Sequence, residues 1–146
     1  MADTRNTFVT IAPDSTAVRA GFRPATRPTL HEIQHRLLTE RPYHYTHETL
    51  CVAVRLVREG RADADGDERA ALQAEMFRKG QPCLRASALT KSYGYGAHYD
   101  PEGRIALYPV DSDEYRAFAA DPSIQNTPAM RSRKQPTSRH VAKVFP

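Results

Sequence analysis

Two histidines and a glutamate near the start of a predicted helix form the sharpest chemical motif of the sequence. His31, Glu32 and His35 match the pattern H-E-x-x-H, in which two His side chains four residues apart share one helix face. Such a pair can bind zinc while the Glu acts as general base on a metal-bound water. A third ligand would have to come from His44, His47 or Glu48.

Other features of this motif favour a different interpretation. No H-x-x-G-x-x-H continuation follows it, and the adjacent Arg36 indicates that the helix face is exposed to solvent. We therefore interpret His31 and His35 as surface residues of an amphipathic helix and assign no metal ligand. A zinc-dependent hydrolase remains the alternative function, and cofactors are left unassigned.

A second set of candidate residues lies between a helix and a hairpin. Arg85, Ser87 and Lys91 offer guanidinium, hydroxyl and ammonium donors in a turn-rich loop, which is typical of an anion cradle without the glycines of a P-loop. Cys83 could be a nucleophile if His98 or an arginine lowered its pKa, but a cysteine next to Leu84 is more often a small buried hydrophobe. The predicted ligand-binding residues, for a small anionic ligand beside the hairpin, are Arg85, Ser87, Lys91, Tyr93, His98 and Tyr108.

The hairpin that carries half of this site is predicted from its turn. Asp100-Pro101-Glu102-Gly103 has the pattern of a type I turn closing into a G1 bulge, with Gly103 at φ > 0. The register then pairs residues 95, 97 and 99 with 109, 107 and 105 on one face, which is interpreted as core. On the other face, Gly96 lies opposite Tyr108, so that either the Tyr108 ring packs over the glycine or a ligand approaches the backbone there.

Capping signals predict the helices around this hairpin. Thr29 and Glu32 form a capping box for a helix that Pro42 ends. Residues 47–58 fit both a helix face and an alternating strand, and the cap at Thr46 with Gly60 after the segment favours helix. Further helices are predicted from Asp65 to a cap at Gly80, and from about residue 113 to 121. Thr7 to Ala12 is β-branched and alternating, which predicts a strand.

These elements define one α+β domain with a small antiparallel sheet, including a hairpin at 93–110, packed with about four short helices. The domain is expected to span residues 1–122, followed by a loosely ordered tail at 123–146 in which Val141 to Phe145 could dock as a strand. With 146 residues, 40% of them hydrophobic and 26% charged, the composition is that of an ordinary globular protein.

The net charge of +4 comes from the C-terminal end of the sequence. Five Lys and Arg residues follow Asp121 with no acid among them, whereas the preceding part has 16 basic and 17 acidic residues. A basic tail can hold nucleic acid, although a short charged terminus is more often simply solvated. A nucleic-acid-associated protein is therefore a further alternative.

Location and partners are bounded only loosely. No apolar run approaches the roughly 18 residues of a membrane helix, and the N-terminus lacks a signal pattern. The two cysteines, Cys51 and Cys83, are too few for a disulfide scaffold. The expected location is the cytoplasm, with no membrane partner, and the oligomeric state is left open.

The sequence also resembles a family of small uncharacterised bacterial proteins known only as a domain of unknown function. The resemblance spans about Thr7 to Tyr115 and lies in the segments TFVTIAPDS, HEIQHRLL, PYHYTHE and FRKGQPCLRASALTKSYGYGAHYDPEGRIALYPVDSDEY. It implies a shared fold and transfers no activity. A small binding or interaction protein is accordingly the leading hypothesis, and whether the protein is an enzyme is left open.

Overall fold

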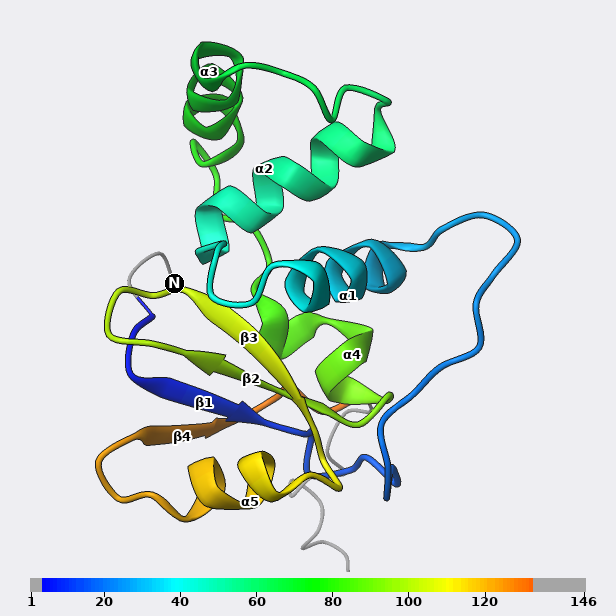
Figure 1. The fold of residues 1–146 in the computed structure, drawn as a ribbon, viewed down its shortest axis with the longest axis vertical. Helices are drawn as coiled ribbons and strands as arrows, with labels where there is room; N and C mark the ends of the chain where they lie inside the picture. Colours follow the sequence, from blue (N-terminus) through cyan, green and yellow to red (C-terminus); the bar gives the residue numbers. More distant parts are fainter. Residues whose placement is uncertain (1–3, 133–146) are drawn as a thin grey trace, which may run out of the picture.

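The computed structural model describes residues 4–132 of the chain. In this part a four-stranded sheet carries helices on both faces, and the helical layer on one face is much thicker (Figure 1). The elements in chain order are β1 (Thr7–Thr10), α1 (Leu30–Glu40), α2 (His47–Arg58), α3 (Gly66–Met76), η1 (Leu84–Ala86), α4 (Ala88–Lys91), β2 (Tyr95–Tyr99), β3 (Ile105–Pro109), α5 (Asp113–Ala120) and β4 (Gln125–Pro128). The predicted α+β class is confirmed. No helix of the described part is long and apolar enough to cross a membrane.

The sheet has the order β3-β2-β1-β4. Strands β1, β2 and β3 pair antiparallel as predicted, whereas β4 pairs parallel with β1 and makes the sheet mixed. The Ala129 amide then donates to the Thr10 carbonyl, and Ala129 is buried. The sheet therefore continues past residue 122, where the sequence placed the end of the domain. The segment gives no strand signal because β4 is an exposed edge strand with little apolar alternation. The rest of the expected tail, including residues 141–145, lies outside the described residues.

The β2–β3 hairpin has the predicted turn and register. Asp100 and Gly103 close the turn through the Gly103 amide and the Asp100 carbonyl, 2.9 Å apart, and Gly103 has φ +81°. The Asp100 carboxylate accepts from the Glu102 and Arg104 amides, which explains the need for an acceptor at the first position. Tyr99 pairs with Ile105, Ala97 with Leu107 and Tyr95 with Pro109.

One face of this hairpin lies in the main core, as predicted. Ala97, Tyr99 and Ile105 are at most 1% exposed. They pack against side chains from β1, α1, α2 and η1, among them Val9, Ile33, Leu38, Leu50, Val54 and Leu84. The alternation of the strand residues was sufficient to identify this face.

The opposite face of the sheet is covered by α5. Phe8 and Tyr115 meet edge to face with ring centroids 4.9 Å apart, and a side chain at Gly96 would overlap both rings. The rings nearest to Gly96 are therefore those of Phe8 and Tyr115, and neither of the two expected alternatives, the Tyr108 ring or a ligand, takes this place. The reason is the position of α5, which lies across β1 as well as β3 and brings Tyr115 over the neighbouring strand.

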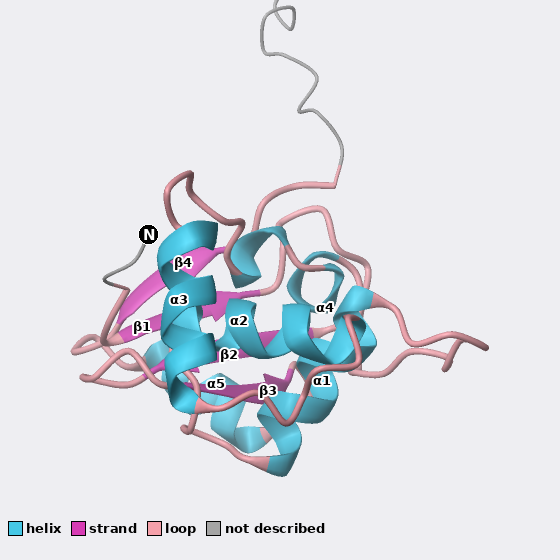
Figure 2. Ribbon diagram, turned by 90° about the horizontal axis from the view of Figure 1, so that it is seen from above, coloured by secondary structure: helices cyan, strands magenta, loops and turns pink. Residues whose placement is uncertain are grey.

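Helix α2 explains why residues 47–58 fit two patterns. Leu50 and Val54 belong to the main core, whereas Val52 and Leu56 belong to a second cluster with α3. Helix α2 lies between α3 and the sheet layer (Figure 1), and Figure 2 shows both helices over the same face of the sheet. Helix α2 is therefore apolar on two sides and resembles an alternating strand. The prediction of a helix is confirmed, with the Thr46 side chain accepting from the Thr49 amide.

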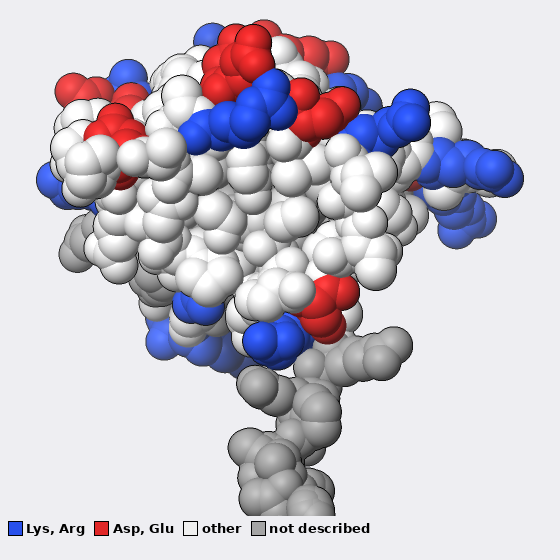
Figure 3. All heavy atoms as spheres, turned by 90° about the horizontal axis from the view of Figure 1, so that it is seen from below, with Lys and Arg blue, Asp and Glu red and all other residues white. Residues whose placement is uncertain are grey.

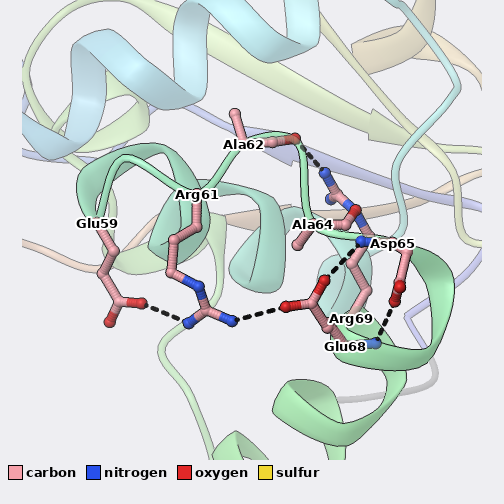
Figure 4. A network of polar contacts seen from close by, with 7 residues as sticks. All are labelled: Glu59, Arg61, Ala62, Ala64, Asp65, Glu68 and Arg69. Atoms are coloured by element: carbon pink, nitrogen blue, oxygen red, sulfur yellow. Dashed lines mark hydrogen bonds and ion pairs between the residues drawn. The ribbon is translucent and has the colours of Figure 1, made fainter.

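Two predicted boundaries change in the structure. Helix α3 begins after its Asp65 cap as expected but ends at Met76, so that Gly80 is not its C-terminal cap. The segment expected as a turn-rich loop contains η1 and α4, because Ser87 ends the first and caps the second. The α2–α3 connection is held by Arg61, which lies between Glu59 and Glu68 (Figure 4).

Candidate functional site

A concavity that contains several polar groups lies between α1, α2 and the segment 81–87. We name it the α1–α2 pocket. Its volume is about 420 Å³, which is within the usual range for small-molecule sites. It is lined by Leu30, Gln34, His47, Leu50, Cys51, Val54, Arg55, Arg58, Glu59, Met76, Gln81, Pro82, Cys83, Leu84, Ala86 and Ser87.

Helix α2 supplies the longest wall of the pocket. Its lining residues are 47, 50, 51, 54, 55 and 58, which recur at the three- and four-residue spacing of one helix face. Leu50 and Val54 at its centre are buried, whereas Arg55 and Arg58 at its end are exposed. The wall therefore changes from apolar inside to basic at the mouth.

A hydrogen bond between α1 and the cap of α4 forms the opposite wall. The Ser87 hydroxyl donates to Gln34 Oε1 over 2.7 Å and accepts from the Leu89 amide. This bond fixes the orientation of the Gln34 amide, whose nitrogen has no acceptor among residues 4–132. The pocket therefore holds an oriented donor.

A histidine and two cysteines also line the pocket. His47 Nδ1 is 3.8 Å from Cys51 Sγ, and Cys83 lines the same pocket. Burial raises the pKa of the Cys51 thiol to about 11 and lowers the pKa of His47. Both groups are therefore neutral at neutral pH, and the pair lacks the thiolate that a cysteine nucleophile needs.

The two arginines at the mouth of the pocket differ in whether they are paired with a carboxylate. Arg55 Nε lies 2.7 Å from Glu59 Oε2, and the other oxygen of Glu59 pairs with Arg61. Arg58 has no ion pair or hydrogen bond from its side chain within the described part of the chain. One guanidinium at the mouth is thus available to an anion.

The six predicted ligand-binding residues do not meet at one place. Ser87 lines the α1–α2 pocket. Arg85 is directed to the sheet edge, where its Nε donates to the Pro128 carbonyl, and Lys91 ends α4. Tyr93 packs against α1 with its ring 4.7 Å from that of His31. The remaining two lie under α5, because His98 follows Ala97 and so faces the opposite side of the sheet.

His98 and Tyr108 belong to a hydrogen-bonded group with a residue that sequence reasoning missed. The Tyr43 hydroxyl lies 2.8 Å from His98 Nδ1 and 2.9 Å from the Tyr108 hydroxyl. Burial and the bond to Tyr108 raise the pKa of Tyr43, and burial lowers the pKa of His98. Phe118 stacks on His98 at 4.1 Å. No sequence signal marks Tyr43, which has φ +59° in the connector between α1 and α2.

The H-E-x-x-H residues are engaged in structural contacts. Glu32 Oε1 accepts from the Ala25 and Thr29 amides, both at 3.2 Å, and these bonds lower the pKa of the carboxyl despite some desolvation. The His31 and His35 rings pack on Phe22 at 4.9 and 5.2 Å. Within residues 4–132 no three His, Cys, Asp or Glu side chains are grouped so that they could hold a metal ion. The zinc hydrolase alternative therefore gains no support.

The buried His47 gives a pH-dependent prediction. Its pKa is lower in the folded protein than its ordinary value of 6.5, because burial outweighs the opposing effect of Glu48. The unfolded chain therefore binds more protons as the pH falls below about 6.5, so the free energy of unfolding must fall there. We expect His47→Gln to reduce the loss of Tm between about pH 8 and pH 5. An unchanged loss of Tm in His47→Gln would contradict this prediction.

The fold and the pocket together define a class: a single α+β domain with one face of its sheet under a helical layer that encloses a small-molecule-sized pocket. A family model described as a family of unknown function, DUF6157, matches residues 1–135, and the chain belongs to this family. No curated protein and no solved structure matches the chain.

Proposed function

We propose that the protein binds a small molecule with an apolar body and an acidic end in the α1–α2 pocket. The observation that carries the proposal is the lining of this pocket, which changes from buried apolar side chains to arginines at its mouth. Ligand sites are typically concave and mostly apolar, with a few placed polar groups. The pocket replaces the hairpin face as the position of the anionic-ligand site.

The apolar body is inferred from the side chains that remain uncovered. Leu30, at the first position of α1, is 45% exposed and lines the pocket. Exposure of this large apolar side chain to water is unfavourable, and a bound apolar group that covered it would regain the hydrophobic free energy. Cys51 and Cys83 add further soft, neutral surface.

The acidic end is inferred from the charges and donors. Arg55 and Arg58 against the single carboxylate of Glu59 leave a net positive mouth, and Glu59 is also shared with Arg61. The Gln34 amide nitrogen adds a neutral donor on the opposite wall. A carboxylate or sulfonate at this end would form charge-assisted hydrogen bonds.

We also infer that the protein works in a reducing compartment such as the cytoplasm, and the two free thiols support this.

The test compares two dyes that share their rings and differ in charge. Anilinonaphthalene sulfonate carries one anionic group, and phenylnaphthylamine is its neutral counterpart. We expect both to bind the native protein and to fluoresce, with the sulfonate bound more tightly. Leu30→Glu should weaken both dyes about tenfold or more, since it places a charge in the apolar wall. Arg58→Glu should weaken the sulfonate alone.

Matched variants elsewhere on the surface control for the new charge. Met130→Glu changes a residue that is 50% exposed and does not line the pocket, and Arg78→Glu changes another exposed arginine that does not line it. Neither should alter dye binding. Equal effects of Leu30→Glu and Met130→Glu would contradict the proposed pocket, and equal effects of Arg58→Glu on both dyes would contradict the acidic end.

A further inference from the structure

A long basic loop connects β1 to α1. We name residues 13–29 the arginine loop. It carries Arg19, Arg23 and Arg27, all exposed, and no acidic residue occurs between Ser15 and His31. Loops of this length without secondary structure are uncommon in compact domains and are usually functional or disordered.

Specific contacts attach the arginine loop to the domain. The Gly21 amide donates to the Tyr93 carbonyl over 3.0 Å, and the Ala25 amide donates to Glu32. The Arg19 carbonyl lies so close to Gly94 that a Cβ there would be 2.6 Å away. The loop therefore presents its arginines from a held backbone, which lowers the conformational entropy lost when they bind a partner.

The three arginines of the loop differ from several other arginines of the domain in their surroundings. Arg55, Arg61, Arg104 and Arg116 each form an ion pair, and Figure 4 shows Arg61 between two carboxylates. No ion pair of Arg19, Arg23 or Arg27 is found within residues 4–132. Figure 3 shows basic side chains gathered at the right-hand edge, the side on which Figure 1 places this loop.

Aromatic rings lie at the base of the same loop. Phe22 packs edge to face on His31 and His35, and its ring centroid is 5.6 Å from that of Tyr93. Tyr95 continues the cluster with its ring 5.0 Å from that of His35. All five side chains are only partly buried, so faces or edges of the rings remain open to solvent. Arg36 borders the same cluster in a shallow hollow that Phe22 also lines.

From these contacts we infer a second binding surface, for single-stranded nucleic acid, formed by the arginine loop and the ring cluster of Phe22, His31, His35, Tyr93 and Tyr95. Arginines contribute by pairing with phosphates and releasing counterions. Partly exposed rings can stack on bases that are not already stacked in a duplex. An acidic peptide would use the arginines but would gain nothing from the rings, and duplex DNA would offer them no unstacked base.

Ser132 lies beside the start of the arginine loop. The Ser132 amide donates to the Asp14 carboxylate over 3.0 Å, at the start of the arginine loop. Residues 133–146 contain four Lys or Arg residues and no acid. The contribution of these four cations to binding must therefore be separated from that of the loop.

The experiment measures fluorescence anisotropy of a labelled single-stranded oligonucleotide of about 15 nucleotides with the full chain. We expect Arg19→Gln, Arg23→Gln and Arg27→Gln combined to weaken binding at least tenfold at about 100 mM salt. The slope of log K against log salt should become shallower by about 2, since three phosphate contacts are lost. Tyr93→Leu removes the aromatic ring but keeps a large apolar side chain and all the positive charges, so it should weaken binding with little change of that slope.

Two further variants make the result specific. Arg41→Gln, Arg78→Gln and Lys79→Gln combined remove the same charge from exposed positions outside the arginine loop, and binding should stay within about twofold. Substituting the four cations after residue 132 by Gln tests the end of the chain. The inference is overturned if the two triple variants lose affinity equally, if the end variant alone abolishes binding, or if duplex of the same sequence binds as tightly as the single strand.

The dye experiment and the oligonucleotide experiment test the two proposals separately. The residues of the arginine loop do not line the α1–α2 pocket, so the two proposals concern separate groups of side chains. A protein that binds the dyes but not the oligonucleotide would retain the first proposal and lose the second.

Discussion

Replacing Gly96 by Val is expected to destabilise the domain by about 3 kcal/mol or more. A Cβ at this position would lie 2.5 Å from Phe8 Cζ and 2.6 Å from Tyr115 Cε2. Neither ring has space to retreat, because Phe8 is fully buried and also packs on Phe118, and the Tyr115 hydroxyl accepts from the Ile11 amide. For a domain of this size the loss corresponds to a fall in Tm of about 10 °C.

The matched control is Gly80→Val. A Cβ added at Gly80 would have no neighbouring atom within 4 Å, and Gly80 does not adopt positive φ, so its replacement should change the free energy of unfolding by about 0.5 kcal/mol or less. Thermal and denaturant unfolding of both variants measure the difference. Equal Tm values for Gly96→Val and the native protein would mean that α5 does not cover β1 and β2 as described.

Local signals made the hairpin and the main helices predictable from sequence. The turn around Gly103 depends on four consecutive residues, and the register then follows from alternation alone. Capping residues such as Thr29, Thr46 and Asp65 act within three residues of each helix start. These features were predictable because the chemistry that fixes them lies within one short stretch.

Features that depend on distant contacts were not predictable in the same way. Strand β4 is held by parallel pairing with β1, more than 100 residues earlier, while its own residues are polar and exposed. The α1–α2 pocket joins α1, α2 and the segment 81–87, and no local pattern shows that these will meet. Sequence reasoning selected Ser87 and considered Cys83, but it paired them with His98, which the strand alternation turns to the other face.

The contacts of the arginine loop were also not predictable from local sequence. Its glycines and prolines correctly predicted a loop, but nothing local indicated that Phe22 would pack on both histidines of the H-E-x-x-H pattern. The sequence predicted both histidines to be surface residues of an amphipathic helix, and in the structure both rings pack on Phe22. Both histidine rings support the loop by packing on Phe22, and the Glu32 carboxylate accepts a hydrogen bond from the Ala25 amide of the loop.

Gly94→Ala is the second substitution with a large expected effect, and it tests how the arginine loop is held. Gly94 has φ +83°, and a Cβ there would lie 2.6 Å from the Arg19 carbonyl oxygen and 3.2 Å from Ala17 Cβ. Gly60 has a similar φ of +72° with no atom within 4 Å, so Gly60→Ala measures the backbone strain alone. We expect a loss of unfolding free energy of about 1 kcal/mol for Gly60→Ala and about 2 to 3 kcal/mol for Gly94→Ala, because the second variant adds the overlap with the loop.

Denaturant unfolding measures both losses, and digestion with trypsin tests the loop directly. Cleavage after Arg19, Arg23 or Arg27 should become faster in Gly94→Ala than in Gly60→Ala. Equal stabilities and equal cleavage rates would show that Gly94 does not hold the loop, and the arginines would then lose the fixed backbone on which the proposed nucleic-acid surface depends.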